Sequence, residues 1–167
     1  MHSLVKHDDF IVRFGKPSDE VQGYKSKPFI FLPFGVVKVQ LPELLKQDPE
    51  KAIKCILECQ YNNVDISKAT ANETASFILW IKEQVDFINS KEAENLQSTP
   101  EPELLASGVT KLNEFGAMAI VDSLAGGDIL KYDDILALPY HKVYQKMKLD
   151  KVNSDIRKKY EKIISKK

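Results

Sequence analysis

The sequence has few of the residue types that build catalytic and metal sites. It contains three histidines and two cysteines in 167 residues, and Cys55 and Cys59 lie four apart with no CxxC or HxxxH pattern to support them. A zinc site needs about four such ligands in convergent positions. The pair Gly126 and Gly127 lacks the lysine and hydroxyl residue that follow the glycines of a phosphate-binding loop. We therefore expect no catalytic residue, metal, cofactor or small-molecule substrate.

Long apolar runs are also missing. The longest, residues 29–37, is interrupted by Pro33 and Gly35 and is far shorter than the roughly 20 apolar residues that span a bilayer. His2, His7 and Asp8 make the start of the chain polar, unlike a secretion signal. We expect a protein that is soluble and intracellular when it is made and that does not contact a membrane.

Residues 1–41 carry the segments with strand-like composition. Residues 10–14 and 36–41 are short, rich in β-branched or aromatic side chains, and bounded by glycine or proline. The polar stretch between them, residues 15–27, is expected to be a loop or an arm that becomes ordered against a partner. We therefore divide one compact unit into an N-terminal β element or extended arm, residues 1–41, and a helical domain, residues 42–167.

Capping residues mark two helices in the first half of the helical domain. Asp48 and Pro49 predict a helix to about residue 62, and Thr70 with Glu73 forms a capping box for a longer helix that ends near residue 96. The apolar face of the long helix should form the core (Phe77, Ile78, Trp80, Ile81, Val85 and Ile88). This helix is the expected central strut of the fold.

The second half predicts shorter helices separated by glycine and proline. Pro102 is well placed to begin a helix, and Gly108 and Gly116 are expected to mark a close helix contact or a bend. The remaining helices are expected over residues 117–125 and 140–149, and after a cap at Asn153 or Ser154. The fold class is therefore mainly α, with five or six amphipathic helices.

Five large apolar side chains crowd into six positions of the N-terminal part: Phe29, Ile30, Phe31, Leu32 and Phe34. Such a density is too high to leave in water. Pro28 and Pro33 make this run difficult to pair as a regular interior strand. We predict that the run binds a neighbouring subunit, and the alternative is that the phenylalanines fold back over the helices.

Charge is unevenly distributed, although the 24 Lys and Arg residues balance the 24 Asp and Glu residues. Residues 140–167 hold ten Lys or Arg against three acids, a balance of +7, which leaves −7 for residues 1–139. The cations Arg157, Lys158, Lys159 and Lys162 are candidates for contact with nucleic acid or another polyanion. The favoured reading is a solvated helix face, because Ile156, Tyr160 and Ile163 or Ile164 form one apolar stripe.

Four runs in the C-terminal half form a common pattern: residues 80–84 (WIKEQ), 111–116 (KLNEFG), 122–131 (DSLAGGDILK) and 138–144 (LPYHKVY). This pattern resembles small helical proteins encoded among the virion and tail-assembly genes of tailed bacteriophages. The resemblance implies a helical fold and a role in building or completing a phage particle, and it implies no catalytic residues.

The function class that best fits these observations is a non-enzymatic structural or assembly component of a phage particle. Its expected partners are other phage structural proteins, with further copies of the chain in a ring as one arrangement, and its expected place is the virion or the host bacterial cytoplasm during assembly. The alternative is a nucleic-acid-binding adaptor or regulator that uses the basic C-terminal helices. An enzyme would need convergent polar groups that the sequence does not indicate.

Overall fold

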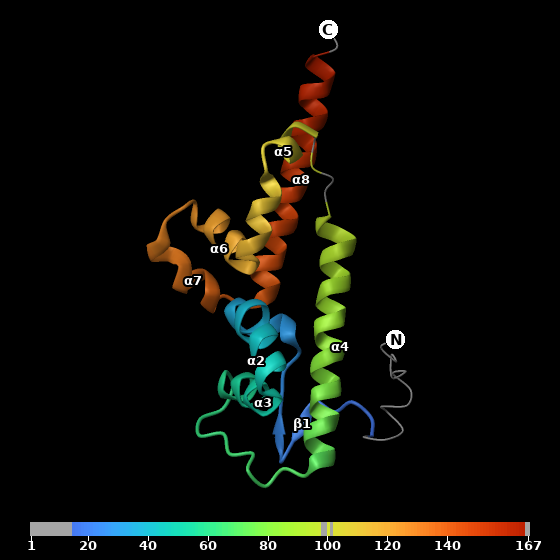
Figure 1. The fold of residues 1–167 in the computed structure, drawn as a ribbon, viewed down its shortest axis with the longest axis vertical. Coiled ribbons are helices and arrows are strands. Elements are labelled where there is room, and N and C mark those ends of the chain that lie inside the picture. The colour runs from blue at the N-terminus through green and yellow to red at the C-terminus, as the bar shows by residue number, and fades with distance from the viewer. Residues whose placement is uncertain (1–14, 98–99, 101, 166–167) are drawn as a thin grey trace.

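The computed structural model describes residues 15–97, 100 and 102–165, and it is mainly α-helical (Figure 1). A two-stranded antiparallel sheet near the N-terminus accompanies the helices, which confirms the predicted fold class. The chain begins with β1 (Glu20–Val21), β2 (Tyr24–Lys25), the 3-10 helix η1 (Phe29–Phe31) and the π-helix η2 (Val36–Gln40). It continues with α2 (Leu41–Gln47), α3 (Pro49–Glu58) and α4 (Ala71–Leu96). The remaining elements are α5 (Pro102–Ala106), the 3-10 helix η3 (Val109–Phe115), α6 (Ala117–Ala125), the 3-10 helix η4 (Ile129–Lys131), α7 (Tyr132–Ala137) and α8 (Tyr140–Ile164).

The small sheet lies in the stretch that was expected to be a loop. Glu20 pairs with Lys25 and Val21 with Tyr24, around a turn in which Gln22 and Gly23 have positive φ angles of 48° and 78°. Two residues with positive φ match the twist of a tight hairpin. Strands of two residues are too short to show an alternating pattern, so the prediction of a loop over residues 15–27 was wrong here.

The predicted strand over residues 36–41 is helical instead. Residues 36–41, expected to be a strand, form η2 and the start of α2, with Val36 and Val37 buried against helices. β-branched composition favours strands only where neighbouring strands are present, and here the neighbours are helices. The other predicted strand, residues 10–14, lies outside the described residues.

The predicted caps of α3 and α4 are confirmed. The Asp48 carboxylate accepts a hydrogen bond from the Lys51 backbone N–H at 3.1 Å. Thr70 Oγ1 accepts from the Glu73 N–H at 3.2 Å, and the Glu73 carboxylate accepts from the Thr70 N–H at 2.8 Å. The capping box fixes the start of α4, which continues for 26 residues, about 39 Å at 1.5 Å per residue.

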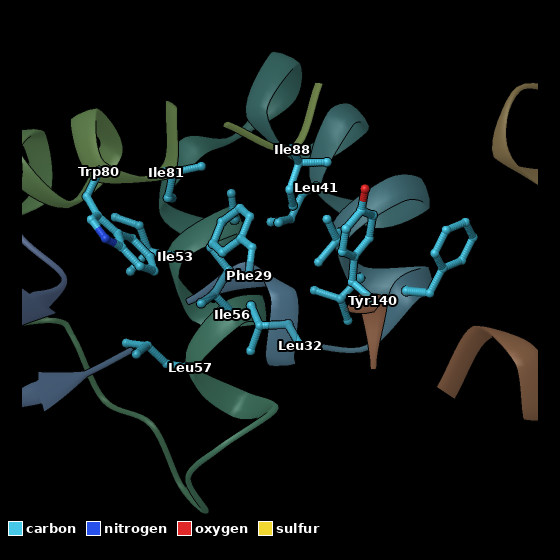
Figure 2. Close-up of a cluster of buried hydrophobic side chains, with 14 of the residues drawn as sticks. Phe29, Leu32, Leu41, Ile53, Ile56, Leu57, Trp80, Ile81, Ile88 and Tyr140 are labelled. Carbon is cyan, nitrogen blue, oxygen red and sulfur yellow. The ribbon is translucent and has the colours of Figure 1, made fainter. Parts of the chain in front are cut away.

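One hydrophobic core joins the N-terminal segment to α3 and α4 (Figure 2). The stripe of α4 contributes Phe77, Trp80, Ile81 and Ile88 as buried residues, and Ile78 and Val85 pack against them partly buried. From α3 come Ala52, Ile53, Ile56 and Leu57, and from the N-terminal segment Val21, Phe29, Leu32, Phe34, Val36, Val37 and Leu41. Residues on both sides of the boundary at residue 41 therefore share the same core.

Glycines divide the segment after Pro102 more strongly than expected. The helix that begins at Pro102 ends at Ala106, and Gly108 adopts φ 85° before η3 begins. Gly116, with φ 51°, separates η3 from α6, and no atom lies within 4 Å of where its Cβ would be. Gly116 therefore meets a backbone requirement, not the close helix contact that was one expectation. α6 ends at Gly126 and Gly127, both with positive φ, as predicted.

The C-terminal helix is unbroken. α8 runs for 25 residues through Asn153 and Ser154, so the predicted end near residue 149 and the new cap were wrong. Three ion pairs at spacing four, Lys146 with Asp150, Lys151 with Asp155 and Arg157 with Glu161, span the expected break. Figure 1 shows α8 extending past the end of α4.

Truncation of the α4 stripe should destabilise the whole core. Ile81 is fully buried, so Ile81→Ala should lower the free energy of unfolding by about 2–4 kcal/mol through lost transfer energy and a cavity. Phe87→Ala on the same helix is the control, because Phe87 is 50% exposed. Urea unfolding followed by far-ultraviolet circular dichroism measures both variants. Equal stability of Ile81→Ala and the parent would contradict the packing described here.

Candidate functional site

The aromatic segment that was predicted to bind a partner lies mainly in the core. Phe29, Leu32 and Phe34 are buried, Ile30 is half-buried, and Phe31 is 53% exposed. For Phe29, Leu32 and Phe34 the predicted role as an exposed binding surface was wrong, and the alternative of packing against the helices describes them. Phe29 meets Trp80 edge to face at 5.3 Å between ring centroids, and Phe34 stacks on Tyr140 at 6.3 Å.

This segment holds the start of α8. The Phe34 N–H donates to the Leu138 carbonyl at 2.7 Å, and the Tyr140 N–H donates to the Leu32 carbonyl at 2.8 Å. Together they form an isolated antiparallel bridge around Pro33 and Pro139. The prolines prevent a longer ladder, as expected. They nevertheless leave two backbone groups free to pair with a segment more than 100 residues away.

A polar cluster adds to the same junction. Glu92 of α4 accepts a hydrogen bond from Tyr140 Oη at 2.8 Å and pairs with Lys38 Nζ of η2 at 2.6 Å. The side chains of Lys38 and Glu92 are each 19% exposed, so water screens the pair only partly. Burial raises the pKa of Tyr140, and the hydrogen bond to Glu92 raises it further. We call these three residues the Glu92 clasp.

Sequence reasoning missed the Glu92 clasp, although the sequence contained a signal for it. Glu92 follows Ile88 by four positions and Val85 by seven, which places a carboxylate on the apolar stripe of α4. A charge on a buried face needs a partner. Lys38 is likewise a charged residue inside an apolar stretch, the one that ends at Leu41, and it has the sign needed to pair with Glu92.

The C-terminal part of α8 exposes an apolar stripe to solvent. We call residues 149–164 the α8 tip. Its stripe residues are each 47–63% exposed and recur at intervals of three, four, four and three (Leu149, Val152, Ile156, Tyr160 and Ile163). The predicted helical stripe of Ile156, Tyr160 and Ile163 therefore exists. About half of each of these side chains is exposed, which makes the tip a candidate surface for another protein.

The four cations proposed for polyanion contact are spread around the α8 tip. Arg157 pairs with Glu161 at 3.1 Å, and Lys158 is half-buried, whereas Lys159 and Lys162 are exposed. Successive helical residues are about 100° apart, so Arg157 and Lys159 point in widely different directions. The structure thus does not bring the four side chains to one face, although all belong to a helix tip with excess positive charge.

A second candidate surface is a groove next to α6. It has a volume of about 460 Å³ and is lined by Leu112, Phe115, Met118, Asp122, Ser123 and Tyr132, which we call the α6–α7 groove. The break at Gly116 sets η3 at one side of α6, and the turn at Gly126 and Gly127 returns the chain so that α7 packs on the other.

The α6–α7 groove is apolar with one acidic group, Asp122, in its lining. Leu112 and Phe115 are 55% and 62% exposed. Tyr132 Oη donates to the Asp122 carboxylate at 2.5 Å, a hydrogen bond that raises the pKa of Tyr132. Close by, the Asp128 side chain caps η4 by accepting a hydrogen bond from the Leu130 N–H at 3.1 Å.

The cysteines lie close together but remain protonated thiols. Cys59 Sγ donates to the Cys55 carbonyl at 3.1 Å, and Cys55 Sγ donates to Gln40 Oε1 at 3.1 Å. Burial, with smaller contributions from Cys59 and Glu58, raises the pKa of Cys55 to about 11, and burial also raises the pKa of Cys59. A thiolate is the form that attacks or ligates. Among the described residues, no three His, Cys, Asp or Glu side chains gather as metal ligands.

A comparison with known protein families, curated proteins and solved structures finds no match to this chain. No helix within the described ranges is long and apolar enough to cross a membrane. The features that bear on function are therefore the exposed surfaces of the α8 tip and the α6–α7 groove.

Phe34 and Phe31 form a matched pair that tests the corrected role of the aromatic segment. Phe34→Ser should destabilise the fold by about 3–5 kcal/mol, because it empties a fully buried site and places a hydroxyl there. Phe31→Ser should change stability by less than about 1 kcal/mol, since Phe31 is half exposed. Thermal and urea unfolding measure both. Similar losses for the two variants would contradict the assigned burial.

Alkaline pH should weaken the fold through Tyr140. Its pKa is raised in the folded chain above the ordinary value of 10.0, so its stabilising contribution is complete below pH 10 and is lost as the pH rises further. Tyr140→Phe should therefore show a shallower loss of stability above pH 10 than the parent, with lower stability at pH 7. Tyr160→Phe is the control, because Tyr160 is exposed on the same helix. Parallel pH profiles for Tyr140→Phe and the parent would refute the assignment.

Proposed function

We propose that this chain is a non-enzymatic structural or assembly component of a tailed bacteriophage particle, which acts by binding neighbouring virion proteins. The observation that carries the proposal is the α8 tip. A helix that leaves the body with five large apolar side chains exposed on one stripe is a surface of the kind that protein partners cover. The resemblance of residues 80–144 to phage virion and tail-assembly proteins gives the setting.

The remaining features agree with a binding role. The α6–α7 groove supplies a second apolar surface, and the half-exposed Phe31 meets His141 of α8 edge to face at 5.6 Å between ring centroids. Asp48 and Glu73 serve as helix caps, and the Cys59 thiol donates a hydrogen bond to a carbonyl of its own helix. The chain would act in the virion, or in the host bacterial cytoplasm while particles are assembled.

The cations of the α8 tip support this proposal better than a nucleic-acid adaptor. Arg157 and Lys151 are engaged by Glu161 and Asp155 on the same helix. A nucleic-acid site usually concentrates unpaired cations on one face and loses affinity steeply with salt. The tip instead combines positive charge that is partly paired within the helix with a continuous apolar stripe, which is suited to an acidic and partly apolar protein surface.

An inventory of purified particles tests the proposal. Particles from cells that make the chain should contain it at a fixed ratio to other virion proteins in quantitative mass spectrometry. If it acts only during assembly, it should instead be absent from mature particles and co-purify with incomplete ones. Ile156→Ser with Tyr160→Ser should reduce incorporation at least tenfold while far-ultraviolet circular dichroism stays unchanged, and Phe87→Ser is the control. Absence from both mature and incomplete particles would refute the proposal.

A further inference from the structure

The α8 tip and the α6–α7 groove are complementary in charge. The tip, residues 149–164, contains five Lys or Arg and three acids, a balance of +2. Residues 109–137, which form the groove and the elements around it, contain five acids and two lysines, a balance of −3. The asymmetry continues at larger scale, from +7 over residues 140–167 to −7 over residues 1–139. Opposite charges of this kind favour encounter between the two surfaces and set their orientation.

The two surfaces are also complementary in apolar character. The tip presents a ridge of exposed side chains centred on Ile156, and the groove presents a hollow of about 460 Å³ flanked by exposed Leu112 and Phe115. This volume lies within the range of sites that enclose drug-sized molecules, so it has room for more than one large side chain. Asp122 lines the hollow, where it can meet Lys159, which lies three positions from Ile156 on the docked tip and about 60° from it around the helix.

The tip cannot fill the groove of its own chain. α8 is one continuous helix whose inward face near its start carries Tyr140, Val143 and Met147. Met147 precedes Ile156 by nine positions, about 180° around the helix, so the stripe faces away from the side that packs on the body. Lys151, Asp155 and Lys158 are half-buried on the inward side, whereas the stripe is exposed. A helix without a break cannot fold back on itself.

We infer that the α8 tip of one copy docks in the α6–α7 groove of a second copy. The inference rests on the proposed function and names a partner for it, namely the chain itself. Ile156 and Tyr160 enter the hollow beside Leu112 and Phe115, while Lys159 meets Asp122. Because the contact joins two different surfaces, a docked pair still offers one free tip and one free groove. Such a contact closes into a ring if its rotation permits and otherwise extends as a filament.

A mixing experiment with the full chain tests this arrangement. The tip variant is Ile156→Ser with Tyr160→Ser, the groove variant is Leu112→Ser with Phe115→Ser, and the control is Phe87→Ser, which changes an exposed aromatic on α4. All the substituted side chains are at least half exposed, so circular dichroism should show the parent's helix content. Sedimentation and light scattering over a concentration series measure the mass.

The parent and the control should form species of more than one chain, whereas each double variant alone should remain a monomer. An equimolar mixture of the tip and groove variants should form a two-chain species and stop there, because each pair retains one intact tip and one intact groove. A parent that stays monomeric overturns the inference. Association of the groove variant on its own overturns it too, because tip-to-tip pairing would explain that result, and so does a mixture that stays monomeric while the parent associates.

Charge provides a second and milder variant that leaves the apolar stripe intact. Lys159→Glu should weaken self-association at least tenfold at low salt, because it places a carboxylate beside the acidic groove. The difference from the parent should shrink as salt rises, since exposed charges are screened over about 10 Å at 0.1 M. A Lys159→Glu variant that associates as the parent does at low salt counts against the docking.

Failure of this inference differs from failure of the proposed function. A chain that is incorporated into particles but is monomeric in solution and insensitive to the groove variant retains the proposed function and loses self-docking. A chain that associates through tip and groove but never accompanies particles retains self-docking and loses the phage role.

Discussion

The polar contacts that join α8 to the rest of the molecule centre on one partly buried carboxylate, Glu92. Glu92 receives Tyr140 from α8 and Lys38 from η2, so three segments that are distant in the sequence meet at its two oxygens. Removing any one partner would leave a charge or a hydroxyl in a poorly solvated place, which costs more than the contact itself contributes. The bridge between Phe34 and Leu138 and the stacking of Phe34 on Tyr140 act at the same point, so the polar and apolar contacts are mutually dependent.

Local features of the fold were predictable from the sequence because they have local causes. The caps at Asp48 and Thr70, the end of α6 at Gly126 and the stripe of α4 all follow from residues within one or two turns of each other. The errors occurred where contacts between segments distant in the sequence determine whether a stretch is a strand, a helix or a helix end. Residues 36–41 have the composition of a strand but lie among helices, and Asn153 and Ser154 resemble a cap but sit within a helix stabilised by ion pairs.

The candidate surfaces divide in the same way. The stripe around Ile156 could be read from its spacing, but spacing cannot tell whether a stripe faces a core or solvent. For the aromatic segment, the density of Phe29, Leu32 and Phe34 correctly indicated that these side chains are buried. The sequence analysis assigned that burial to contact with another subunit, whereas the side chains pack in the core of their own chain. The α6–α7 groove could not be predicted, because it depends on how three short elements turn at Gly116 and Gly126.

The length of α8 has a geometric consequence for any assembly that uses its tip. Ile163 lies 23 positions beyond Tyr140, about 35 Å along the helix at 1.5 Å per residue. A rotation of about 5° at the junction with Glu92 would therefore move the tip by about 3 Å, roughly the rise of two helical residues. The helix is held at its N-terminal end, so a small rotation there becomes a large displacement at its C-terminal end. The curvature of an array built through the tip would then be set by packing around Phe34 and Tyr140, far from the surfaces that touch.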